Sequence, residues 1–165
     1  MDIDSLLNYL EQYGIYFLCL IFFLENLNVP GLPAGVIMPA VGALIDQGKI
    51  SFFPTFIASV VASLGGSFVL YAVGYFFGYP LLNKLSGRYQ RTQRLIDKLF
   101  NYFDRYGNKS VFILRLVPVA RTFVSLVAGV TRLDLKDFLL YSGGGIFIWN
   151  FALIYFGFVF SDLFL

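Results

Sequence analysis

The stretch that decides the fold is residues 111–130, VFILRLVPVARTFVSLVAGV, an apolar run that carries Arg115, Pro118 and Arg121. An arginine at the centre of a membrane costs about 2.5–3.5 kcal/mol even on lenient insertion scales, so two of them require a partner or a function. Proline lacks a backbone donor and disfavours helix at the preceding residue, so Pro118 is expected to break the run. The stretch therefore predicts a broken helix at membrane depth, with two fixed cations around a site for an anion.

The composition indicates an integral membrane protein. Of the 165 residues, 58% are hydrophobic and 13% charged, whereas an ordinary soluble domain has roughly 25% charged residues. This length allows one compact membrane domain, residues 1–165. Because the N-terminus is acidic where a signal peptide would be basic, we expect no cleavable signal peptide.

The chain has no histidine and a single cysteine, Cys19. Zinc and haem sites built on histidine, catalytic triads and disulfides are therefore not expected. Accordingly, the sequence predicts no catalytic residue, no metal ligand and no cofactor.

Three apolar segments have roughly the length needed to cross a membrane. They are residues 13–24 with their amphipathic lead-in, residues 52–79 and residues 138–160. Between the first two, residues 28–48 contain Pro30, Pro33, Pro39 and Gly42, too many helix breakers for one straight helix. We expect residues 28–48 and 111–130 to form two re-entrant hairpins whose backbone groups are satisfied by protein or water.

A basic connection, residues 80–109, separates the two halves of the chain. It holds seven lysines and arginines against two aspartates, and Leu95, Leu99, Phe103 and Tyr106 form an apolar stripe along it. This pattern is typical of an amphipathic helix at a membrane surface, and it explains the charge without nucleic-acid binding. The positive-inside rule places the connection in the cytoplasm, which predicts a multi-pass protein of the bacterial cytoplasmic (inner) membrane.

The second half of the chain, about residues 110–162, repeats features of residues 28–79. Each half has a proline-broken segment that ends at a glycine, Gly42 or Gly129, followed by a polar connection and a helix with a glycine cluster. An odd number of crossings between the halves would invert one relative to the other. Inverted repeats with discontinuous segments are typical of secondary transporters.

The block Phe112-x2-Arg115-x2-Pro118-x2-Arg121, followed by Ala128-Gly129, resembles the signature of the DedA family, also called VTT or SNARE-associated membrane proteins. Three further blocks agree with this resemblance: Glu25-Asn26 ahead of Pro30 and Pro33, the turn from Pro39 to Gly42, and Gly66-x4-Tyr71-x2-Gly74-x3-Gly78. It covers about residues 17–155. The resemblance implies two membrane-penetrating hairpins and the movement of lipid across the bilayer, with undecaprenyl phosphate or phosphatidylethanolamine as substrates.

The resemblance also implies that Glu25, Arg115 and Arg121 are the functional acid and arginines. Guanidinium groups bind phosphate through two parallel hydrogen bonds and stay charged when desolvated, which favours a lipid phosphate as the ligand of the arginines. Glu25 is either a proton carrier or the countercharge of an arginine. The remaining motif residues are expected to shape the hairpins rather than touch substrate: Pro30, Pro33, Pro39, Gly42, Pro118 and Gly129.

The sequence departs from the family pattern at acidic and basic positions. Ala34-Gly35 follow Pro33 where many members have a glutamate, Ser67 stands where many have aspartate, and Tyr75 where many have a basic residue. Glu25 is thus left as the one carboxylate inside the apolar segments. Coupling of transport to protons or sodium remains open.

We therefore predict a non-enzymatic transporter, a flippase for a membrane lipid with an anionic phosphate headgroup. One alternative is a lipid scramblase without ion coupling. Another is a structural protein whose arginines pair with acids of a second copy in a homo-oligomer. An enzyme acting on lipid phosphates is the least supported, because the known patterns need histidines or aspartate clusters in membrane segments.

Overall fold

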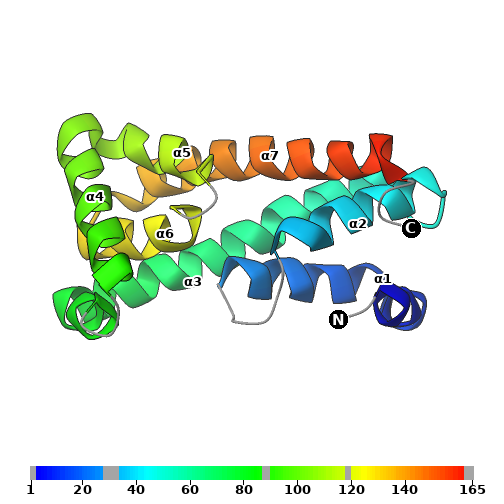
Figure 1. The fold of residues 1–165 in the computed structure, drawn as a ribbon, viewed down its shortest axis with the longest axis horizontal. Helices are drawn as coiled ribbons and strands as arrows, with labels where there is room; N and C mark the ends of the chain where they lie inside the picture. Colours follow the sequence, from blue (N-terminus) through cyan, green and yellow to red (C-terminus); the bar gives the residue numbers. More distant parts are fainter. Residues whose placement is uncertain (1–2, 28–33, 87–89, 118–119, 162–165) are drawn as a thin grey trace. The chain divides into compact units, whose positions relative to one another are not determined.

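The computed structural model describes residues 3–27, 34–86, 90–117 and 120–161, and every regular element in these ranges is helical (Figure 1). This confirms the all-α prediction. The elements are α1 (Ile3–Asn26), α2 (Ala34–Asp46), α3 (Phe52–Ser86), α4 (Gln90–Tyr106), the 3-10 helix η1 (Gly107–Lys109), α5 (Ser110–Arg115), α6 (Arg121–Val130) and α7 (Leu135–Val159).

Within the described ranges, two helical segments are long and apolar enough to cross a membrane, Phe52–Gly78 of α3 and Leu135–Val159 of α7. The third predicted span, residues 13–24 with their amphipathic lead-in, is not one straight helix in the structure. Gly14 adopts φ 58° and ψ −143°, so the helix kinks there and the apolar part is only Gly14–Asn26. A straight span needs about 20 residues. Gly78 has a similar conformation, with φ 54° and ψ −145°, and ends the first span within one residue of its predicted boundary.

The chain forms two compact units that both long helices pass through. The first unit comprises residues 1–66 and 146–165, and the second comprises residues 67–145. The first therefore combines α1 and α2 with the beginning of α3 and the end of α7, whereas the second combines α4, α5 and α6 with the other halves.

In the first unit, α2 packs against α7 with almost no space between the backbones. A Cβ atom added at Gly42 would collide with the carbonyl oxygen of Ile154, and one added at Gly157 would collide with the carbonyl oxygen of Pro39. Pro39 lies inside α2 and does not end it, so the predicted break at this proline is wrong. Because α2 begins only at Ala34, the missing donor of Pro39 removes a single hydrogen bond near the start of the helix. The predicted breakers Pro30 and Pro33 lie outside the described residues.

Buried polar side chains also join the two long helices within the first unit. Nδ2 of Asn150 in α7 donates to Oγ of Ser59 at 3.2 Å and to Oγ of Ser63 at 3.4 Å, both in α3. The hydroxyl of Ser59 in turn donates to the carbonyl of Phe56 at 2.8 Å. Such contacts hold helices together in lipid, where water cannot satisfy polar groups.

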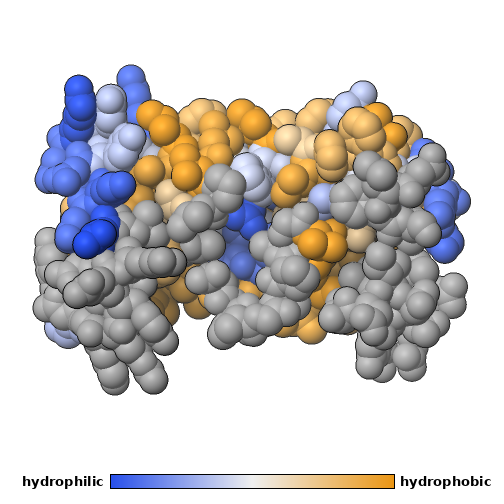
Figure 2. Space-filling view, in the orientation of Figure 1, coloured by the Kyte–Doolittle hydropathy of each residue, from blue (hydrophilic) through white to orange (hydrophobic). Residues whose placement is uncertain are grey.

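In the second unit, the amphipathic helix α4 turns its apolar stripe toward other helices. Leu99 and Phe103 belong to a buried cluster with residues of α5, α6 and α7, and Ile96 packs with Leu126 and Val130 of α6. The stripe was predicted to face the membrane; in the structure, its residues Leu99 and Phe103 are covered by protein. Tyr106, assigned to that stripe, is instead exposed. Figure 2 shows hydrophilic side chains over α4 and apolar ones along α7.

The second unit repeats the close helix crossing of the first. A Cβ atom at Gly129 of α6 would collide with the carbonyl oxygen of Tyr71 in α3, and one at Gly74 of α3 would collide with the carbonyl oxygen of Leu126 in α6. Gly42 and Gly129 thus have equivalent roles, because each allows a short helix to touch a long one backbone to backbone.

Candidate functional site

The helical run of residues 110–130 is interrupted where the sequence predicted a break. The last turn of α5 tightens after Arg115, because the N–H groups of Leu116 and Val117 donate to the carbonyls three residues earlier, both at 3.2 Å. A new helix, α6, then begins at Arg121. Pro118 itself lies outside the described residues. The two arginines therefore lie on either side of the break, one at the end of α5 and one at the start of α6.

Arg115 is enclosed by three helices, with 3% of its surface exposed. Its Nη2 donates to Oγ of Ser125 in α6 at 2.7 Å. Its guanidinium carbon lies 5.8 Å from the centroid of the Phe138 ring in α7. A Cβ atom at Gly145 of α7 would lie 2.9 Å from the Cβ of Arg115. Only glycine therefore leaves room there for the arginine side chain.

The surroundings of Arg115 do not neutralise its charge. Within the described ranges, no carboxylate pairs with Arg115 and its Nε has no hydrogen-bond partner. The buried Oγ of Ser142 in α7 likewise has no partner there, and Ser142 lies on the same face of α7 as Phe138 and Gly145. Because buried charges are normally paired, this site offers a cation and an unused donor to an anion.

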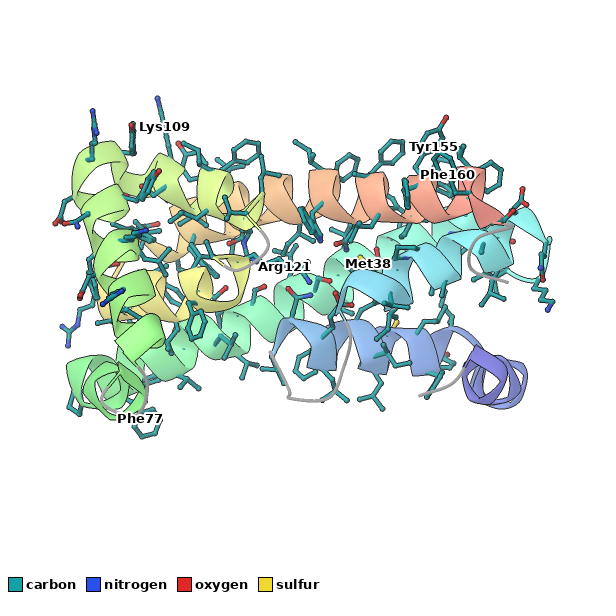
Figure 3. The ribbon with its side chains drawn as sticks, viewed as in Figure 1. Met38, Phe77, Lys109, Arg121, Tyr155 and Phe160 are labelled. Carbon is teal, nitrogen blue, oxygen red and sulfur yellow. The ribbon has the colours of Figure 1, made fainter. Side chains whose placement is uncertain are left out.

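Arg121 is the more accessible member of the pair. It is half-buried at the first position of α6 (labelled in Figure 3). It lies in the same unit as Arg115, on the other side of the break.

Glu25 belongs to the first unit, whereas both arginines belong to the second. It lies one residue before the end of α1 and is buried, with 5% of its surface exposed. Its neighbour Asn26 donates to the carbonyl of Phe22 at 3.2 Å and packs against Gly66 of α3. Of the three predicted site residues, the structure thus brings Arg115 and Arg121 together within one unit.

Sequence reasoning did not identify three residues that contact Arg115, namely Ser125, Phe138 and Gly145, nor Ser142 on the same face of α7. Two of them carried a signal, since Ser125 and Ser142 are hydroxyl residues in otherwise apolar segments. Their part in the site depends on which helix faces meet, which the sequence does not specify.

Comparison of the sequence with known proteins finds a family model and several bacterial relatives. Residues 29–159 match the family model of the VTT domain. Undecaprenyl phosphate transporter A of Staphylococcus aureus is 29% identical over 160 residues, which are 94% of this chain and 78% of that protein. Protein DedA of Escherichia coli is 27% identical over 159 residues, 92% of this chain and 72% of that protein. An alkaline phosphatase-like protein of Lactococcus lactis is 28% identical over 164 residues, 96% of this chain and 76% of that protein. No solved structure matches the chain.

Proposed function

Because the chain belongs to the VTT-domain family, also known as the DedA family, we propose that it moves a phosphate-bearing lipid between the leaflets of the bacterial cytoplasmic membrane. The lipid would be undecaprenyl phosphate, as the names of two similar proteins suggest, or a glycerophospholipid such as phosphatidylethanolamine. In this proposal Arg115 and Arg121 bind the phosphate.

The observation that carries the proposal is the burial of Arg115 without a carboxylate partner among the described residues. Leaving a cation unpaired in a low-dielectric site is costly, so the charge must serve a ligand that is present part of the time. A phosphate oxygen fits this requirement, since a guanidinium can donate two parallel hydrogen bonds to it. The half-buried Arg121 would meet the phosphate first, and Arg115 would hold it deeper.

We further propose that the chain is an inverted repeat in which α5 and α6 form one re-entrant hairpin, and the end of α1 forms the other with α2. In both units, two adjacent glycines of a long helix contact a phenylalanine and the polar residue three positions after that phenylalanine. In the first unit, Gly65 and Gly66 contact Phe23 and Asn26. In the second unit, Gly144 and Gly145 contact Phe112 and Arg115. These glycines lie in α3 in the first unit and in α7 in the second. If one repeat is inverted in the membrane relative to the other, α7 is expected to take in the second repeat the place that α3 takes in the first.

The repeat would give the site a charge asymmetry. In these matching contacts Asn26 takes the position of Arg115, and Glu25 is the residue before Asn26. One hairpin would therefore carry a buried acid one residue before the position at which the other hairpin carries a buried base. Glu25 would act as the ion-pair partner of an arginine or as a proton carrier that is protonated when the lipid phosphate is bound.

The test is leaflet exchange of labelled lipids by the purified protein in liposomes. Arg115→Ala and Arg121→Ala are expected to abolish exchange, and Arg115→Lys to lose most of it, because an ammonium group lacks the planar fork of a guanidinium. Lys98→Ala is the matched control, since it removes an exposed cation of α4 in the same unit. Wild-type exchange in folded Arg115→Ala and Arg121→Ala proteins would refute the phosphate-binding role.

The same liposomes separate this proposal from its alternatives. A proton or sodium gradient should accelerate the wild type if transport is coupled, and Glu25→Gln should remove the proton effect. A rate of lipid exchange that neither the proton gradient nor the sodium gradient changes would indicate a scramblase. Release of inorganic phosphate from the lipid would indicate an enzyme, the possibility that the name of the Lactococcus relative raises. No exchange of any lipid by a multimeric protein would favour the structural role.

A further inference from the structure

A pocket of about 420 Å³ lies in the second unit, between the middle of α3 and the turn that joins α6 to α7. Its size is within the roughly 300–1,000 Å³ of ligand sites. One wall is apolar and consists of Phe68, Ala72 and Phe76, which recur every four residues along α3. The other side is polar and carries Arg132 and Asp134. The pocket therefore joins an apolar surface to two opposite charges.

Arg132 is held in a strained backbone conformation. Its φ is 53°, and it is the one residue other than glycine with a positive φ in the part of the chain that the structure describes. It occupies the left-handed position of a C-terminal cap, in which its N–H donates to the Gly129 carbonyl and the N–H of Leu133 to the Ala128 carbonyl, both at 3.0 Å. This position favours glycine strongly, because a side chain is disfavoured in the left-handed region.

Helix α2 ends with the same cap and has the favoured residue. There the left-handed position is Gly48, with φ 71°, and the N–H of Lys49 donates to the Leu44 carbonyl at 3.1 Å. The chain thus builds one turn without strain and the equivalent turn with an arginine. Strain of this kind persists at sites where the side chain has a function.

The strained turn presents the Arg132 guanidinium at the pocket with its donors available. The guanidinium carbon lies 5.4 Å from the centroid of the Tyr75 ring, and among the described residues the group makes no hydrogen bond or ion pair. Asp134, two residues later, does not neutralise it. One carboxylate oxygen of Asp134 accepts the N–H of Lys136 at 2.8 Å and thereby caps the start of α7.

The pocket lies close to one end of each candidate membrane span, where the apolar helix gives way to polar residues. The apolar segment of α3 ends at Gly78, and the other candidate span begins at Leu135. Phe76, on the apolar wall, is 80% exposed. In a membrane protein, this is the depth at which lipid headgroups meet the hydrocarbon. An exposed ring beside charged groups fits a ligand that has both a headgroup and chains.

We propose that this pocket binds the headgroup of a zwitterionic glycerophospholipid. The phosphate accepts hydrogen bonds from Arg132, the ammonium group lies near the carboxylate of Asp134, and the acyl chains leave along Phe68 and Phe76 into the bilayer. Two fixed charges of opposite sign disfavour a purely anionic lipid, because Asp134 would repel it. This inference goes beyond transport and does not involve Arg115 or Arg121.

The test measures lipid retention by the full-length protein, using native mass spectrometry with phosphatidylethanolamine and phosphatidylglycerol of identical chains. The wild type should retain phosphatidylethanolamine preferentially. Arg132→Gly should weaken its retention by roughly 10- to 100-fold, the value of a charge-assisted hydrogen-bond pair. Because glycine relieves the strain, this variant should melt at the same or a higher temperature, which separates lost binding from lost folding.

Asp134→Asn supplies the second variant. Asparagine caps a helix as well as aspartate does, so α7 should keep its start while the negative charge is lost. The preference for phosphatidylethanolamine over phosphatidylglycerol should then disappear. Lys136→Ala, which removes an exposed charge from the same turn, should leave both lipids unaffected.

The proposal is overturned if Arg132→Gly retains phosphatidylethanolamine as the wild type does, or if the wild type shows no preference between the two lipids. Equal competition by glycerophosphoethanolamine without chains would also overturn it, because the site would then recognise a soluble phosphate compound. These readouts contain no transport step, so they can fail or succeed independently of leaflet exchange.

Discussion

Arg115 at the end of α5 and Ser125 in α6 are joined by a hydrogen bond of 2.7 Å between two side chains that are both almost fully buried. The bond connects two short helices across the break that separates them. It also fixes the direction of the guanidinium, which lies over the ring of Phe138, while the aliphatic part of the side chain packs against Gly145 of α7. The positioning of Arg115 thus depends on a neutral hydroxyl.

Replacing this hydroxyl should destabilise the protein. We expect Ser125→Ala to lower the free energy of unfolding by about 1.5–3 kcal/mol, the contribution of a hydrogen bond to a charged group. Thermal unfolding in detergent would measure it. Ser142→Ala is the matched control, because this equally buried hydroxyl has no partner among the described residues and its removal should not destabilise. Equal losses in the two variants would argue against a specific role of the Arg115–Ser125 bond.

Two adjacent glycines of α3 should respond in opposite ways to alanine. A Cβ atom at Gly66 would lie 2.6 Å from the carbonyl oxygen of Phe23, a backbone atom that cannot move aside easily, so Gly66→Ala should destabilise or abolish folding. A Cβ atom at Gly65 would meet only the ring of Phe23, at 3.5 Å. Gly65→Ala should therefore be neutral, or stabilising by up to about 1 kcal/mol from helix propensity. The expression yields and melting temperatures of the two variants would test this prediction. A Gly66→Ala variant as stable as the wild type would contradict the close contact between α1 and α3.

The covered stripe of α4 predicts a packing cost for substitutions that a lipid-facing stripe would not show. Leu99 is 1% exposed, so Leu99→Ala should lower the free energy of unfolding by about 2–5 kcal/mol. Lys98→Ala, its exposed neighbour, should stay within about 0.5 kcal/mol of the wild type. Both are measured by unfolding in detergent, without lipid. An unchanged melting temperature in Leu99→Ala would mean that the stripe faces the membrane after all.

The polar link between α3 and α7 should be modest in strength. Asn150→Leu is expected to cost about 0.6–1.7 kcal/mol, the range for hydrogen bonds between membrane helices. The cost stays low because Ser59 keeps its bond to the Phe56 carbonyl when the asparagine is gone. A double-mutant cycle with Ser59→Ala would isolate the coupling energy. A coupling near zero would show that the two helices are joined by packing alone.

The sequence predicted features that depend on local chain chemistry. Proline and two arginines in one apolar run indicated the break, with Arg115 before it and Arg121 after it. The end of the apolar run at residue 79, where the basic connection begins, indicated the end of the first long span. An error arose at Gly14, because the positive φ of this one residue kinks α1 and limits its straight apolar part to Gly14–Asn26. Pro39 was overrated as a breaker because its position within the helix, near the start of α2, was unknown.

Features that depend on which surfaces meet could not be predicted. The stripe of α4 has the same periodicity whether lipid or protein covers it, so the pattern alone did not identify α5 and α6 as its partners. The serine that holds Arg115 lies in another helix, across the break. The residue identities of Gly145 and Arg132 also carried no sign that one makes room for an arginine and that the other is strained. All of these follow from tertiary contacts.

The passage of α3 and α7 through both units has a consequence for how the protein is made. The second unit ends at Gly145, so all of its residues have been synthesised before the end of α7 is added. The first unit must wait, because α2 can complete its contact at Gly42 only after Ile154 and Gly157 have been added. The first unit contains the residues that are synthesised first, and it is nevertheless the last unit to complete its packing. Until then a membrane-insertion factor or the lipid itself must cover the face of α2 that α7 later occupies.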